Sequence, residues 1–151
     1  MKKSKTTVLI AVIAAGAGLM VTAAAGASAT APSTVSGDGG DRIGIVKGDG
    51  SSHAKAGGLN ALWKGQADKV LQLELSGNRI GVLKDDGILF VKEGSLDALW
   101  NRQATHVIQF ALSGTRVAYL ADNGNAFAKQ GAVNATQWTT EADHVTEIAL
   151  S

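Results

Sequence analysis

Residues 79–114, RIGVLKDDGILFVKEGSLDALWNRQATHVIQFALSG, decide the fold, because this stretch has a close copy on each side. The preceding copy, residues 42–77, reads RIGIVKGDGSSHAKAGGLNALWKGQADKVLQLELSG. The following copy, residues 116–151, reads RVAYLADNGNAFAKQGAVNATQWTTEADHVTEIALS. A fixed internal period is typical of a supersecondary unit stacked on copies of itself. We therefore expect three repeats of about 37 residues, at 42–78, 79–115 and 116–151.

Turn signals inside each copy predict short β-strands, and no segment shows a sustained helical period. Every copy places an Asp-Gly or Asn-Gly pair between two apolar runs, at Asp49-Gly50, Asp86-Gly87 and Asn123-Gly124. These pairs supply the positive φ angles of tight hairpins. A second turn falls at residues 76–78 and 113–115. The runs between turns predict four strands per repeat, which in the second copy include 79–83 and 88–93 and a short strand through the Trp.

Alternation along the strand at 70–75 predicts which face is buried. Leu71, Leu73 and Leu75 share one face, and the other face is mixed. A strand with this pattern is typical of a position between packed sheets. We therefore expect the three leucines to be buried together.

The order V-x-x-x-x-L-S-G, then R-I-G-V-L, then D-D-G-I-L-F-V-K-E-G and a Trp resembles the repeats of tectonin or tachylectin-type β-propellers. The resemblance covers residues 42–151, although these repeats are shorter than most of that group. It implies an all-β protein in which each repeat is a four-stranded propeller blade. It also implies a lectin-like function.

Three blades do not complete a ring, because propellers usually close with four to eight. Two chains of three blades would give a six-bladed ring, so we expect a homodimer in which the last strand of one chain completes a sheet of the other. A β-trefoil is the alternative, since three repeats of four strands close in one monomer. The Q-x-W pattern of lectin trefoils is missing, however.

The first 41 residues read as a leader and a linker. A basic start, an apolar run and the small-residue site Ala27-Ser28-Ala29 predict a signal peptide at 1–29, with a membrane anchor as the alternative. Residues 30–41 are rich in turn formers and predict a flexible lead-in. We therefore expect a secreted, extracellular protein with no membrane association after cleavage. Its lack of cysteine favours a bacterial source.

Charge excludes one class of partner. Without Lys2, Lys3 and Lys5, 11 of the 14 basic residues remain against 13 acidic ones, a formal net charge of −2. A protein with no basic excess has little attraction for phosphates, so we expect no nucleic-acid partner.

Tryptophan recurs once in every copy and suggests a sugar-binding platform. A Trp ring can stack on the C–H face of a pyranose while neighbouring polar groups bind its hydroxyls. The candidate ligand-binding residues are the three tryptophans and the polar residues three or four positions before them: Trp63, Trp100, Trp138, Asn60, Asp97 and Asn134. The alternative is that each Trp packs one blade against the next, because aromatic residues at a repeat spacing are often core.

Other polar residues recur at the same spacing, and we expect them to be structural. Arginines that lie inside apolar strands predict bridges to a carboxylate or to carbonyls of the adjacent blade: Arg42, Arg79 and Arg116. The repeated lysines predict solvated positions on an outer strand: Lys55, Lys92 and Lys129. The histidines lack the spacing of a metal site and predict surface positions: His53, His106 and His144.

No catalytic set is apparent, since no G-x-S-x-G occurs and Asp86 has a counterpart in every copy, at Asp49 and Asn123. The sequence therefore predicts a secreted, multivalent, lectin-like repeat protein that binds a glycan or cell-surface polysaccharide without catalysis, metal or cofactor. The alternative is a structural or protein-interaction β-repeat module with no sugar site.

Overall fold

A computed structural model describes residues 33–35 and 41–151 of the 151-residue chain. The signal peptide expected at 1–29 lies outside the described residues. All regular structure within them is β, as the sequence predicts. No helix in this part of the chain is long and apolar enough to cross a bilayer.

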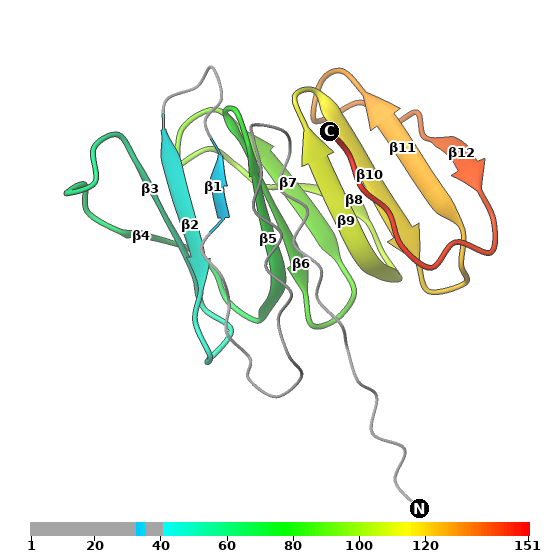
Figure 1. The fold of residues 1–151 in the computed structure, drawn as a ribbon, viewed down its shortest axis with the longest axis horizontal. Helices are drawn as coiled ribbons and strands as arrows, with labels where there is room; N and C mark the ends of the chain where they lie inside the picture. Colours follow the sequence, from blue (N-terminus) through cyan, green and yellow to red (C-terminus); the bar gives the residue numbers. More distant parts are fainter. Residues whose placement is uncertain (1–32, 36–40) are drawn as a thin grey trace, which may run out of the picture.

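In this part of the chain, twelve strands form three separate four-stranded antiparallel sheets, which stand side by side in chain order (Figure 1). We call these sheets blades 1, 2 and 3. Blade 1 contains β1 (Ser33–Val35), β2 (Arg42–Val46), β3 (Ser52–Ala56) and β4 (Lys64–Ala67). Blade 2 contains β5 (Val70–Ser76), β6 (Arg79–Lys84), β7 (Leu89–Glu93) and β8 (Asn101–Ala104). Blade 3 contains β9 (Val107–Ser113), β10 (Arg116–Ala121), β11 (Ala126–Gln130) and β12 (Thr139–Ala142).

This arrangement confirms the expected three four-stranded, propeller-like repeats. Each blade begins one strand before its repeat arginine, because β5 and β9 pair with the strand that follows them rather than with the preceding sheet. Blade 1 takes its first strand from the expected lead-in. There, Ser33–Val35 pairs with β2, so the lead-in is not entirely without structure.

The repeated Asp-Gly and Asn-Gly turns form the predicted hairpins, with a geometry that uses one positive φ rather than two. In blade 2, Gly87 has a φ of 76° and donates its N–H to the Lys84 carbonyl at 3.0 Å. The Asp86 carboxylate accepts the Ile88 N–H at 3.1 Å and closes an Asx turn. Glycine is required here because a side chain would be strained in the left-handed region.

A β-bulge near the start of the first strand overturns part of the predicted burial pattern. Pairing of β5 with β6 shifts between Val70 and Gln72, and β9 with β10 shows the same shift. The extra residue reverses the alternation before it. Leu71 is therefore 57% exposed, whereas Val70, Leu73 and Leu75 are buried.

The core lies between the blades. One apolar cluster joins blades 1 and 2 and includes Ala54, Leu73 and Val82, and a second joins blades 2 and 3 and includes Val91 and Phe110. A small residue lets neighbouring sheets approach, since a Cβ placed on Gly81 would lie 2.4 Å from Phe110 Cε2. No blade hides its own apolar face, so each depends on its neighbour.

Candidate functional site

The loop between the third and fourth strands carries the tryptophan of each blade. The sequence predicts a strand through this residue, but β4, β8 and β12 each begin just after it. In blade 2 the Lys92 ammonium lies 4.5 Å from the Trp100 ring centroid and donates to the Leu96 carbonyl at 2.6 Å. Blade 3 repeats the unit, with Lys129 at 4.8 Å from Trp138 and 2.9 Å from the Val133 carbonyl. Each lysine thus ties its loop to a tryptophan ring.

These contacts correct the expectation that the repeated lysines are solvated. Lys55, Lys92 and Lys129 are 9%, 3% and 7% exposed. Burial lowers the pKa of Lys92 and of Lys129, because a low-dielectric surrounding disfavours the ammonium. A buried cation needs partners, and the loop carbonyls and the indole face supply them.

Two of the three tryptophans are partly packed between blades. Trp100 packs against the cluster that joins blades 1 and 2, and Trp138 packs against the cluster that joins blades 2 and 3. Trp138 also meets Tyr119 edge-on, with ring centroids 4.8 Å apart. Trp63, in blade 1, is 43% exposed. Each ring therefore has a structural contact and an accessible part.

The expected polar partners lie on the exposed side of the same loop. Asn60, Asp97 and Asn134 are all exposed. Asp97 forms an ion pair with Lys64 of β4, so the loop of blade 2 reaches the outer strand of blade 1. Similarly, Gln103 of β8 donates to the Val133 carbonyl in the loop of blade 3 at 3.1 Å. The loop and the preceding outer strand form a polar seam between blades.

The repeated arginines make the interblade bridges that the sequence predicts, in two of the three copies. Arg42 donates to the carbonyls of Asn78 and Gly94 in blade 2. Arg79 donates to the Gly131 carbonyl in blade 3 and lies 3.0 Å from the Glu93 carboxylate. Burial lowers the pKa of Arg42. Arg116 is exposed.

Sequence reasoning missed a glutamine contact between the first strands of successive blades. Gln72 of β5 donates to the Phe110 carbonyl at 2.7 Å and accepts the Phe110 N–H at 3.2 Å. Gln109 of β9 repeats the pair with the backbone of Ile148, at 3.3 and 3.2 Å. The sequence shows a Gln at the same position in both strands, but the β-bulge decides toward which blade its side chain points.

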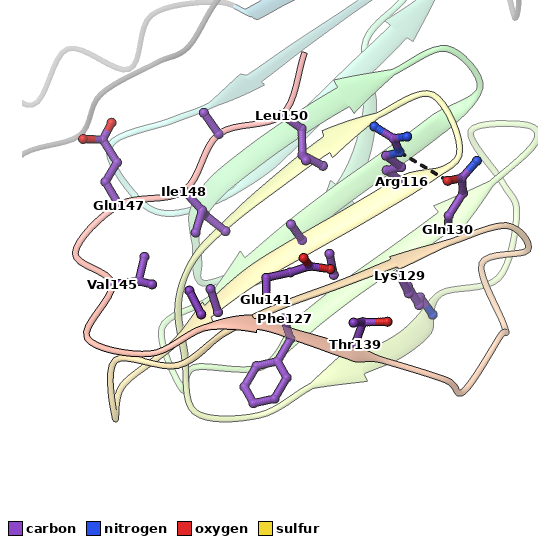
Figure 2. A pocket seen from close by; sticks show the side chains of 15 residues that line it. Arg116, Phe127, Lys129, Gln130, Thr139, Glu141, Val145, Glu147, Ile148 and Leu150 are labelled. Carbon is purple, nitrogen blue, oxygen red and sulfur yellow. Dashed lines mark hydrogen bonds between the residues drawn. The ribbon is translucent and has the colours of Figure 1, made fainter.

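Residues 145–150 lie across blade 3 and leave an open groove beside it (Figure 2). The groove has a volume of about 660 Å³. Its walls come from β10, β11 and β12 on one side, including Arg116, and from Ile148 and Leu150 on the other. Arg116 bonds to Gln130 of its own blade at 3.3 Å. No pattern in the sequence indicated this groove.

The histidines do not assemble a site. His106 and His144 share with Lys69 a left-handed backbone, with φ of 58°, 55° and 58° respectively, immediately before the repeated valine. Their equivalence therefore reflects a turn. In the described part of the chain, no three His, Cys, Asp or Glu side chains gather as metal ligands would.

Comparisons with known proteins concern the fold. No family model and no curated protein matches the chain. Similar solved structures include the N-terminal domain of Nup159, with TM-score 0.52 and 12% identity over 75% of this chain and 30% of that one. Human WBSCR16 is similar at TM-score 0.52 and 16% identity, over 71% of this chain and 37% of that one.

A structure of S. cerevisiae Dbp5 bound to Nup159 and Gle1 also matches, at TM-score 0.52 and 14% identity over 71% of this chain and 29% of the matched one. The chain thus spans about a third of the length of these neighbours. The chain has a β-propeller-like fold. Identities this low carry no activity or partner from the neighbours to this chain.

Proposed function

We propose that the chain is a secreted, non-catalytic, multivalent carbohydrate-binding protein of the tectonin or tachylectin type. The observation that carries the proposal is the polar seam at the outer edge of the blades, which occurs at both junctions and uses a loop that recurs in all three blades. There, one loop brings a Trp ring and an exposed amide or carboxylate to the outer strand of the preceding blade, as Trp100 and Asp97 do beside Lys64. Sugars suit such a surface, because they offer C–H faces to an aromatic ring and hydroxyls to polar groups.

Weak sites become effective when they are repeated. The two seams and the loop of blade 1 can engage one polysaccharide at once, which raises avidity without any new contact. Pairing of two chains into the six-bladed ring expected from the sequence would present six loops. We include this homodimer in the proposal.

A triple alanine variant tests the polar half of the seam. Asn60→Ala/Asp97→Ala/Asn134→Ala removes groups that are exposed, so each change should alter the unfolding free energy by no more than about 0.5 kcal/mol. On a glycan array, this variant should no longer bind the glycans that wild type binds. The matched control, Asp68→Ala/Thr105→Ala/Asp143→Ala, changes another repeated polar position at a different end of the blade and should bind normally.

Equal binding by both triple variants, or no glycan bound by wild type, would overturn the carbohydrate function. It would favour the second candidate, an interaction module with no sugar site. The specific observation in favour of that candidate is the packing of Trp100 and Trp138 against interblade clusters. Under that candidate, Trp100→Ala should lower the unfolding free energy rather than silence a site, by up to the roughly 3 to 5 kcal/mol that truncating a fully buried Trp costs.

A further inference from the structure

We propose that the open face of blade 3 binds blade 1 of a second copy of this chain, and that residues 145–150 pair with β2 of that copy. This defines the surfaces and the strand register of the homodimer, and it holds with or without a sugar site. The trailing face of a blade is defined as the face toward the next blade in chain order. The leading face is the face toward the preceding blade.

One interface occurs twice inside the chain. The trailing face of blade 1 receives Leu73 and Leu75 of β5, which lie against Gly44. The trailing face of blade 2 receives Phe110 and Leu112 of β9 against Gly81. Both junctions also carry an arginine bridge to the glycine carbonyl of the next blade. A surface that forms the same contact twice is suited to form it a third time.

On blade 3, the trailing face is only half covered. Arg42 and Arg79 are 6% and 1% exposed, whereas Arg116 is exposed. The segment 145–150 supplies the equivalent of β9, and the clasp between Gln109 and Ile148 holds it in place. Ile148 is nevertheless only half-buried, while its equivalents Leu73 and Phe110 are buried. The remaining strands of a fourth blade would complete the burial.

The leading face of blade 1 shows the complementary gap. Ile80 and Val82 of β6 are 0% and 1% exposed, but their equivalents in β2, Ile43 and Ile45, are half-buried. Leu59 is 79% exposed. Its equivalents in the other loops, Leu96 and Val133, pack on the interblade clusters. Within residues 33–35 and 41–151, no blade stands before blade 1 or after blade 3.

Strand pairing favours the same partner. Residues 145–150 repeat the pattern of β5 and β9 but form no strand themselves. The edge of β2 is covered by β1 through three residue pairs, whereas β5 and β9 each form six pairs with the strand that follows. Residues 145–150 of a second copy would replace β1 and complete this sheet. The register of blade 2 places Glu147 opposite Val46 and Leu150 opposite Ile43.

Hydrogen bonding completes the match. Arg42 bonds to the carbonyls of Asn78 and Gly94, and the equivalent residues of blade 1 are Asp41, just before β2, and Gly57, just after β3. Arg116 of one copy would therefore donate to the carbonyls of Asp41 and Gly57 in the other. Two such contacts, related by a two-fold axis, close six blades into a ring, within the usual range for propellers.

Engineered cysteines test the register directly, because the chain has no cysteine of its own. In the full chain, Glu147→Cys/Val46→Cys should give a covalent dimer on mild oxidation, because opposed residues on antiparallel strands lie about 4.5 to 5.5 Å apart at Cα, within disulfide range. The matched control, Glu147→Cys/Ile45→Cys, puts the thiols on opposite faces of the sheet and should give at least about fivefold less cross-linked product. Equal cross-linking of the two variants would overturn the register.

Light scattering tests the interface without relying on the cysteines. Wild type should have the mass of two chains. Leu59→Asp should shift it toward one chain, while Leu62→Asp, in the same loop and 90% exposed, should leave the dimer intact. A wild-type mass of one chain at all concentrations would overturn the interface, whatever the glycan array shows. A dimer that binds no glycan would overturn only the carbohydrate function.

Discussion

Gly81→Ala should loosen the contact between blades 2 and 3. A Cβ at this position would lie 2.4 Å from Phe110 Cε2 and 3.0 Å from Leu112 Cδ1. Carbon atoms in contact prefer about 3.5 to 4.0 Å, and Phe110 is only 1% exposed, so its ring has little room to move. Overpacking of this kind costs about 1 to 3 kcal/mol. The loss of backbone freedom in the unfolded chain returns about 0.4 to 1 kcal/mol, so we expect a net loss of about 1 to 2 kcal/mol.

Urea denaturation followed by tryptophan fluorescence and circular dichroism measures this loss. Gly65→Ala is the control, because a Cβ there would have no atom within 4 Å. Blade 3 already has an alanine at the equivalent position, Ala118, and there the equivalent of Phe110 is the smaller Ile148. Adding Phe110→Ile to Gly81→Ala should therefore recover part of the stability, with a coupling of at least about 0.5 kcal/mol in a double-mutant cycle. Wild-type stability for Gly81→Ala, or simple additivity with Phe110→Ile, would refute the reasoning.

Two further predictions concern buried charges. Arg79→Leu should lower the unfolding free energy by about 2 to 3 kcal/mol, because it removes charged hydrogen bonds to Glu93 and to the Gly131 carbonyl. Arg116 is exposed, so Arg116→Leu should cost less than about 0.5 kcal/mol when both variants are measured in the monomeric Leu59→Asp background. Equal losses of unfolding free energy for the two variants in urea melts would contradict the interblade role of Arg79. Burial raises the pKa of Glu74 above its ordinary 4.5, because the folded protein favours the protonated carboxyl. The stability that Glu74 contributes is therefore fully present below pH 4.5 and is lost as the pH rises through the raised pKa. Urea melts should therefore show Glu74→Gln more stable than wild type at about pH 7 and equal to it below about pH 4, and a gap independent of pH would exclude this cause.

Local pattern predicted the strands well, but it failed where one extra residue enters the ladder. Strict alternation placed Leu71 with Leu73 and Leu75, yet the bulge at the start of β5 turns Leu71 outward and Val70 inward. A bulge bends the strand and increases its twist, and so changes how it lies against its neighbour. Its position is therefore a property of the packed sheets, and the apolar pattern of one strand does not contain it.

The candidate site was predicted in composition and only partly in environment. The sequence grouped Trp100 with Asp97, although it placed Trp100 in a strand rather than in the loop before β8. It also predicted bridging arginines, which Arg42 and Arg79 confirm. It misjudged Lys92, which is buried under the Trp100 ring. Lysine is seldom buried, so a surface position was the better expectation from residue type. The loop carbonyl and the indole face that stabilise it come together only after the blade folds.

The sequence by itself determined the number of repeats, their turns and their all-β character, because these depend on spacing and on residues whose backbone preferences are local, such as Gly87 at positive φ. Tertiary structure alone decided which faces meet. Arg79 and Arg116 occupy the same place in the same repeat, but one is buried and the other exposed. The physical reason is that burial depends on whether another blade stands opposite, and the local sequence around a repeated arginine does not contain that information.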